Sequence, residues 1–234
     1  MKKHIPNIIT CLNVTCGSIA IVAATLYNDI IVAACFILLG MVFDFFDGLT
    51  ARALGVKSEL GKELDSLADV CSFGVAPAIL AYLLISESVQ ITSGSSWLAV
   101  TPILIPALSA YRLAKFNLDT RQTVSFIGMP TPANALFWVG LVFGKEWAPE
   151  IYDAIFGSPV VLAIFAVGFA IALISELPMF SLKLQGFGWR GNELLYIFLA
   201  FVLVLIPIVG AGTTMFIIPL YFVICLLGKI IGRR

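Results

Sequence analysis

Residues 30–69 read IIVAACFILLGMVFDFFDGLTARALGVKSELGKELDSLAD, an apolar run followed by a segment that holds four aspartates. The run from Ile30 to Phe43 contains no charged residue, and similar apolar stretches recur along the chain. About 20 such residues cross a bilayer as a helix. The chain is 60% hydrophobic and only 12% charged, whereas soluble domains are about a quarter charged. The sequence therefore predicts an all-α integral membrane protein, a polytopic helical bundle.

The candidate spans are apolar runs separated by polar residues, glycine or proline, as at Asn28-Asp29 and at Gly157-Ser158-Pro159. They lie at about residues 8–27, 30–50, 62–86, 96–116, 131–146, 157–177, 191–208 and 212–231. We therefore expect about eight transmembrane helices. The span at 131–146 is the shortest of them.

The basic residues gather on one side of this arrangement. If the N-terminus is inside, every Lys and Arg except Lys145 lies in a cytoplasmic segment. This is the positive-inside pattern of membrane proteins. It predicts that both termini, and the polar loop after the second span, are cytoplasmic in a multi-pass protein of the plasma (inner) membrane. The formal net charge is zero, and we expect no nucleic-acid partner.

The four aspartates lie at the facing ends of two consecutive spans. Asp44 and Asp47 are three residues apart, and Asp65 and Asp69 are four apart, so each pair shares one helix face. The short loop between the spans lets the two pairs face each other. An ionised Asp in a span costs roughly 2.5–3.5 kcal/mol, and the pairs would also repel. A bound cation would offset both effects.

Carboxylates without a neighbouring His or thiolate prefer hard divalent ions. We therefore expect these four aspartates to hold Mg²⁺ or Mn²⁺, with Ca²⁺ as an alternative. We expect two ions, because four carboxylates offer more oxygens and charge than one Mg²⁺ needs. Paired divalent ions typically serve displacement at phosphorus. The competing interpretation is a set of interfacial charges solvated at a loop.

Two glycines and an arginine accompany the aspartates. Gly48 lies four residues after Asp44 and shares its helix face. Gly61 stands in the same relation before Asp65. Missing side chains at these positions would let a ligand approach the backbone. Arg52, one turn after Gly48, could hold a phosphate by bidentate hydrogen bonds.

The spacing D44-x2-D47-G48-x2-A51-R52-x8-G61-x3-D65-x3-D69 resembles the signature of the CDP-alcohol phosphatidyltransferase family at every fixed position. Members of this family are membrane enzymes that pass a phosphatidyl group from a CDP-lipid to a small alcohol and release CMP. The resemblance implies a bundle of six core helices, here with two accessory helices, and it implies divalent metal.

The resemblance also implies roles for individual residues. The principal metal ligands would be Asp44, Asp47 and Asp65. Asp69 would complete the shell of the second ion and act as general base. The CDP moiety would contact Gly48, Arg52 and Gly61. The first span carries a polar stripe, Asn7, Thr10 and Asn13, which would border the nucleotide; hydrogen bonding between helices is the other interpretation of that stripe.

Further segments are similar to the membrane-embedded members of the family that use serine as the acceptor. They are PNIITCLN (6–13), VCSFGVAPA (70–78), RLAKFN (112–117) and FIGMPTPANA (126–135). The resemblance covers about residues 5–145. We therefore expect a catalytic core at 1–146, with 147–234 forming the remaining helices of the same bundle. Family members are often homodimers, so the resemblance also implies a dimer.

This likeness implies CDP-diacylglycerol and L-serine as substrates, and phosphatidylserine and CMP as products. Arg112, Lys115 and Arg121 could bind the carboxylate of serine, although membrane topology and anionic lipid headgroups would also explain them. An acceptor with its own phosphate, such as glycerol phosphate or inositol phosphate, would also require basic residues. The choice of serine therefore depends on the likeness.

A divalent-cation transporter is the alternative from a different functional class. The aspartates would then form an ion site within the membrane. All four lie near one face, however, and no second set of carboxylates lines a path to the other face. The remaining embedded acid, Glu176, lies at the end of a span. The sequence therefore favours the enzyme.

Overall fold

The computed structural model describes residues 4–56, 58–118, 126–179 and 192–230. The α-helices are α1 (His4–Leu26), α2 (Ile30–Ala53), α3 (Glu59–Asp69), α4 (Ala76–Thr92), α5 (Leu104–Leu118), α6 (Thr131–Trp147), α7 (Pro149–Phe156), α8 (Pro159–Ile174), α9 (Glu193–Val209) and α10 (Ile217–Ile230). A π-helix, η1 (Val70–Val75), joins α3 to α4, and the 3₁₀-helices η2 (Ser96–Ile103) and η3 (Gly210–Met215) precede α5 and α10. The strands are β1 (Phe126–Ile127) and β2 (Pro178–Met179).

The predicted helical membrane class is confirmed. Within the described residues, five helical segments are long and apolar enough to cross a membrane: His4–Leu26, Ile30–Ala53, Glu59–Thr92, Ser96–Leu118 and Glu193–Met215. A sixth is present if α7 and α8 count as one span, although they meet at a bend of 75°. The expected count of about eight is not confirmed, because α6 and α10 have only 17 and 14 residues.

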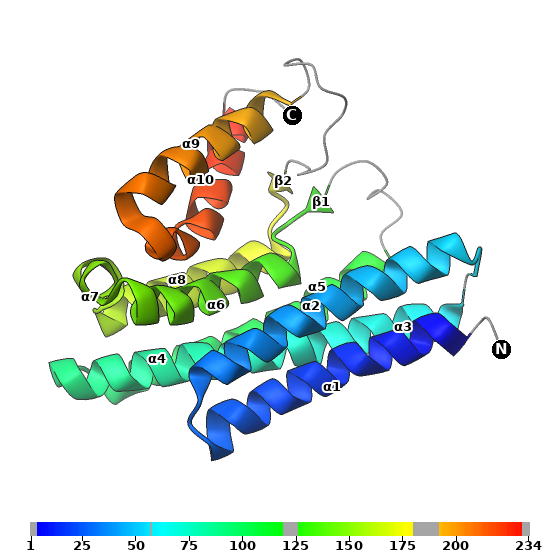
Figure 1. Ribbon diagram of the computed structural model, residues 1–234, viewed down its shortest axis with the longest axis horizontal. Coiled ribbons are helices and arrows are strands. Elements are labelled where there is room, and N and C mark those ends of the chain that lie inside the picture. The colour runs from blue at the N-terminus through cyan, green and yellow to red at the C-terminus, as the bar shows by residue number, and fades with distance from the viewer. Residues whose placement is uncertain (1–3, 57, 119–125, 180–191, 231–234) are drawn as a thin grey trace.

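Small residues bring the first two helices together. Figure 1 shows α1 and α2 running side by side. The buried residues include Ala20, Ala23 and Ala24 on α1. On α2 they include Ala33 and Ala34. Small side chains let helix backbones approach closely, which is how helices associate in lipid.

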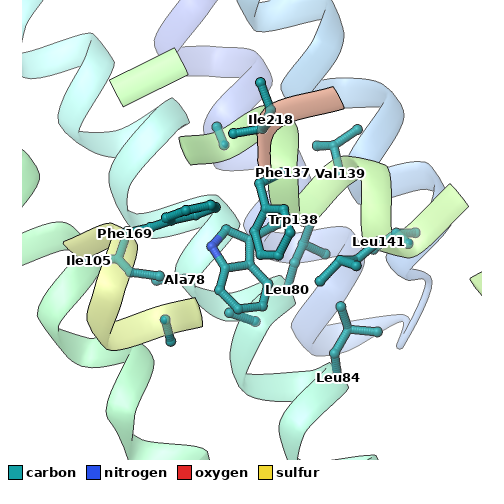
Figure 2. Close-up of a cluster of buried hydrophobic side chains, with 14 of the residues drawn as sticks. Ala78, Leu80, Leu84, Ile105, Phe137, Trp138, Val139, Leu141, Phe169 and Ile218 are labelled. Carbon is teal, nitrogen blue, oxygen red and sulfur yellow. The ribbon is translucent and has the colours of Figure 1, made fainter. Parts of the chain in front are cut away.

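This pair lies at one side of the bundle, and α9 and α10 lie at the opposite side (Figure 1). The chain from α3 through η1 to α4 contacts α1, α5 contacts η1 and α8, and α9 and α10 contact each other on the far side of α6. Between α6 and α8 lies an aromatic core, part of which Figure 2 draws in close-up. The Phe137 ring packs against Phe165 and Phe169, with ring centroids 5.0 and 4.8 Å apart.

A π-helix interrupts the third apolar run, which the sequence predicted as one continuous span at 62–86. In η1 the amide of Ala76 donates to the carbonyl of Cys71, five residues earlier. Pro77 follows and has no amide hydrogen to continue an α-helical ladder. Turns of this kind occur often at functional sites. Here the π-helix begins directly after Asp69.

The two short strands fix the start of α6 against the end of α8. β1 pairs with β2 in antiparallel register. Gly128 follows β1 with φ +79°, and its amide donates to the carbonyl of Leu177 at 2.9 Å. A Cβ at Gly128 would lie 2.7 Å from the carbonyl oxygen of Ser175, so only glycine fits. Two-residue strands leave too short a pattern to be recognised in a sequence.

Candidate functional site

A tight connection between α2 and α3 positions the aspartates. After α2 ends, Gly55 adopts φ +63°, a conformation that glycine accepts without strain. The hydroxyl of Ser58 then accepts a hydrogen bond from the amide of Gly61 at 3.2 Å and caps the start of α3. The cap places Gly61 in the first turn of α3, with Asp65 and Asp69 one and two turns further along.

Three of the four carboxylates come together. One oxygen from each of Asp44, Asp47 and Asp65 lies within 4.8 Å of the other two. Asp47 is buried, Asp44 and Asp65 are half-buried, and Oδ1 of Asp65 has no hydrogen-bond partner among the residues that the structure describes. Oxygens that share one Mg²⁺ or Ca²⁺ lie at similar separations, because metal–oxygen distances are about 2.0–2.6 Å. This donor set fits a hard divalent ion.

Asp69 lies beside this group but is not one of its three members. It is buried, and the charges of Asp44 and Asp65 act on it. The side-chain amide of Asn13 donates to Oδ1 of Asp69 at 3.4 Å. The charge of Asp69 also acts on Arg112 of α5.

Helix α1 supplies the polar partners of the aspartates. The hydroxyl of Thr10 donates to Oδ2 of Asp47 at 2.6 Å, and Asn13 donates to Asp69. Hydrogen bonding between helices therefore accounts for two members of the polar stripe. Thr10 also lines a cavity, as does Asn7. Both interpretations of the stripe thus have support in the structure.

A cavity of about 370 Å³ opens between α1, α2 and α3. It falls in the size range of small-ligand pockets, about 300–1,000 Å³. Its lining residues are Pro6, Asn7, Thr10, Asp47, Gly48, Ala51, Val56, Ser58, Glu59, Gly61, Lys62 and Asp65. Both glycines of the motif face this space, and a Cβ at Gly61 would lie 3.0 Å from Oδ1 of Asn7. The cavity therefore adjoins the carboxylate group.

Two basic residues lie near the cavity. Arg52 is exposed, and its Nη1 lies 3.6 Å from the point that a Cβ at Gly48 would occupy. Lys62 lines the cavity, and its ammonium donates to the carbonyl of Asn117 on α5 at 2.7 Å. Sequence reasoning missed Lys62, although a base directly after Gly61 in the motif could have pointed to it.

The three basic residues expected near the acceptor do not share one environment. Arg112 is buried, with its guanidinium 5.9 Å from the centre of the Phe116 ring. Lys115 is exposed, and its ammonium lies 3.7 Å from a carboxylate oxygen of Glu176. Arg121 lies outside the described residues. Arg112 is thus the member of this set that the structure brings toward Asp69.

Sequence reasoning gave no role to Ser109, Thr131 and Asn134. These residues are fully buried, and their side-chain polar atoms have no hydrogen-bond partner among the described residues. Their signal in the sequence was polar character inside apolar spans, a signal that does not separate ligand contacts from contacts between helices.

Comparisons with known proteins agree with the motif. The family model for CDP-alcohol phosphatidyltransferase matches residues 3–172. A CDP-diacylglycerol–serine O-phosphatidyltransferase of Bacillus subtilis is 35% identical over 75% of this chain and 89% of its own length. A protein of the same name from Methanocaldococcus jannaschii is 32% identical over 77% and 88%. One from Mycobacterium leprae is 34% identical over 75% of this chain but only 57% of its own length.

The family match covers most of the chain and includes every element that lines the cavity. It confirms the resemblance on which the sequence analysis drew. This chain belongs to the CDP-alcohol phosphatidyltransferase family.

Proposed function

We propose that this protein transfers the phosphatidyl group of CDP-diacylglycerol to L-serine, giving phosphatidylserine and CMP. The observation that carries the proposal is the group formed by Asp44, Asp47 and Asp65 at the edge of a cavity that two glycines line. The names of the related proteins support serine as the acceptor.

The carboxylate group is the proposed metal site. Asp44, Asp47 and Asp65 would hold a divalent ion, Mg²⁺ or Mn²⁺, and Asp69 would contribute to a second. The unpartnered oxygen of Asp65 supports this assignment, because a buried acceptor without a donor is costly. When bound, such ions neutralise charge on a diphosphate and polarise the phosphorus.

The cavity is the proposed site of the CDP moiety. Gly48 and Gly61 leave room for the nucleotide against the backbones of α2 and α3. Asn7 and Thr10 would border it from α1. Arg52, which lies over Gly48, would bind a phosphate oxygen. The acyl chains would lie between helices and open toward the bilayer.

Asp69 is the proposed general base. It is buried beside the metal site but is not one of the three clustered carboxylates, so it would serve to take a proton rather than to hold the first ion. The serine hydroxyl oxygen would form a bond to the phosphorus of the phosphatidyl group and give its proton to Asp69. The bond from that phosphorus to the bridging oxygen would break, and CMP would leave with the electron pair. We favour this direct displacement because the neighbouring carboxylates are committed to metal.

The site is proposed to lie at the cytoplasmic face of the plasma membrane, with both termini on the same side. The distribution of Lys and Arg supports this orientation. Residues 1–146 would form the catalytic core, because the cavity is lined entirely by residues before position 66.

The decisive experiment measures CMP released from CDP-diacylglycerol by the purified protein, with and without L-serine. We expect release that depends on both serine and a divalent ion. A related transfer to glycerol phosphate or inositol phosphate is the alternative within the family. Release with one of these alcohols but not with serine would refute the proposed acceptor.

A further inference from the structure

A second group of buried polar side chains lies on helices that do not line the cavity. It consists of Ser109 and Arg112 on α5 and Thr131 and Asn134 on α6, which we call the polar set. Oγ of Ser109, Nε of Arg112, Oγ1 of Thr131 and both polar atoms of the Asn134 side chain are buried without a partner among the described residues. An unsatisfied buried group costs about 1–3 kcal/mol, so a polar occupant is expected.

Helix periodicity places these residues on one level of the bundle. Figure 2 shows the Trp138 ring of α6 with its indole nitrogen on the side of Ile105 from α5 and Ala78 from α4. The three helices alternate in direction. A step of one turn toward the Asp69 end therefore leads from Trp138 to Asn134 on α6 and from Ile105 to Ser109 on α5.

Contacts agree with this level. A Cβ at Gly74 would lie 3.2 Å from Cβ of Ser109, so the backbone of η1 touches α5 there. η1 contacts α6 as well as α5. One further turn toward the same end lie Arg112 on α5 and Thr131 on α6. η1 begins directly after Asp69, and the charge of Asp69 acts on Arg112, so the Arg112 end of the polar set lies toward that carboxylate.

Asp69 thus lies between two different environments. On one side are the carboxylate group and the cavity, which are built from α1, α2 and α3. Toward α5 is Arg112 of the polar set, on which the charge of Asp69 acts. A base that activates an acceptor hydroxyl must contact the acceptor on one side and the phosphorus centre on the other.

We propose that the polar set recognises the backbone of the amino-acid acceptor, with Asn134 as the residue that accepts a hydrogen bond from its ammonium group. This inference rests on the proposed function. Arg112 supplies positive charge and donors for a carboxylate. Asn134 supplies an acceptor and a donor on one rigid amide, and the two hydroxyls supply both kinds of group. The set therefore matches a zwitterion, which carries both charges.

The composition of the polar set also separates acceptor classes. A phosphate-bearing alcohol carries about two negative charges and would require several cations, but Arg112 is the only charged member of the set. A buried site that hydrogen-bonds a substrate group rejects analogues that lack this group, because its own polar atoms are then left unpaired. The ammonium of serine is the group that an alcohol phosphate lacks.

The test uses purified full-length protein and compares Asn134→Leu with wild type in CMP release. The KM for serine is expected to rise at least about tenfold, while the KM for CDP-diacylglycerol stays within about twofold. Thr131→Val should raise the KM for serine by a smaller factor. Ser88→Ala is the control, because Ser88 is also a buried hydroxyl, and it donates to the carbonyl of Gly157 near the end of α4 that is remote from Asp69.

A second measurement uses serine analogues. Wild type should prefer serine strongly over 3-hydroxypropanoate, which lacks the ammonium, and Asn134→Leu should lose most of that preference. If Asn134→Leu does not fold, Ser109→Ala and Thr131→Val carry the test through binding of radiolabelled serine. Folded variants with an unchanged KM for serine and unchanged preference would overturn the inference, and water would then be the partner of these groups. Wild type that releases no CMP with serine would overturn the proposed function as well.

Discussion

Two parts of the bundle differ in composition and packing: the wall, formed by α1, α2 and α3, and the core between α6 and α8. The wall is made of carboxylates, hydroxyls and glycines, and it encloses space. The core is made of large rings, and its members Phe137 and Trp138 are completely buried. The wall holds carboxylates close together although they repel each other, whereas apolar contacts stabilise the core. Activity and stability should therefore respond to different substitutions.

Metal removal should have the largest effect. We expect a chelator to abolish CMP release, because the group formed by Asp44, Asp47 and Asp65 would then have no cation. Adding Mg²⁺ or Mn²⁺ back should restore the rate, and Asp44→Asn should raise the metal concentration needed for half-maximal activity. Full activity in chelator would show that the wall does not work as a metal site.

Asp69→Asn should lower kcat by about 10²–10⁴, the usual contribution of a general base. The variant should unfold at the same temperature as wild type or higher, because it removes one of four neighbouring negative charges. Steady-state kinetics and a thermal melt check both parts. Near-normal kcat in the folded variant would exclude Asp69 as the base.

Phe137→Ala should affect the core and leave the wall intact. The side chain is completely buried against four other rings, and loss of such a residue costs about 3–5 kcal/mol. We expect a clearly lower unfolding temperature in detergent, with serine and CDP-diacylglycerol KM values close to wild type in the fraction that stays folded. Phe201→Ala is the control, since Phe201 is 53% exposed. Equal unfolding temperatures for the two variants would contradict the assigned core.

Gly61→Ala should change the wall without unfolding it. The added Cβ would lie 3.0 Å from Oδ1 of Asn7 and inside the cavity lining. We expect the KM for CDP-diacylglycerol to rise about tenfold, less than the roughly 10² that a 1 Å displacement costs. Gly168→Ala is a matched control, because a Cβ there meets nothing within 4 Å. The same KM for both variants would mean that the cavity does not hold the donor.

Lys145→Met should have the smallest effect. Lys145 forms an ion pair with Glu87 that joins α6 to α4 at the end of the bundle opposite to Asp69. Both side chains are partly exposed, and such pairs contribute about 0.2–1 kcal/mol. Activity should be unchanged and the unfolding temperature should fall by only a few degrees. A large loss of activity would contradict this expectation, because it would mean that the Lys145–Glu87 pair influences the site at the opposite end of the bundle.

The approach of Asp44, Asp47 and Asp65 could be predicted from the sequence because the information is local. Helical spacing alone puts Asp44 with Asp47 and Asp65 with Asp69, and a short loop brings the pairs together. The partners of these residues on α1 were visible as the stripe Asn7, Thr10 and Asn13. Which partner each one takes depends on how closely α1 packs against α2 and α3, and spacing alone does not carry that information.

Other features depended on backbone geometry or on contacts between distant segments. The break into α7 and α8 follows from Gly157-Ser158-Pro159, but the angle of 75° depends on packing. The pairing of β1 with β2 joins segments about 50 residues apart through two-residue strands. The lack of partners around Asn134 emerges only when every neighbouring side chain is in position. These features required the three-dimensional structure.

The π-helix η1 rotates the side-chain directions of α4 relative to those of α3. Each residue turns an α-helix by about 100°, so the additional residue in this widened turn rotates everything after Pro77 relative to Asp65 and Asp69. Without it, the side chains at Leu80 and Leu84, which are buried in the core, would point in another direction. Deleting one residue from 70–75 would restore a regular helix but leave the acidic face and the apolar face out of phase. The length of this short segment therefore sets the rotation between the acidic face of α3 and the apolar face of α4.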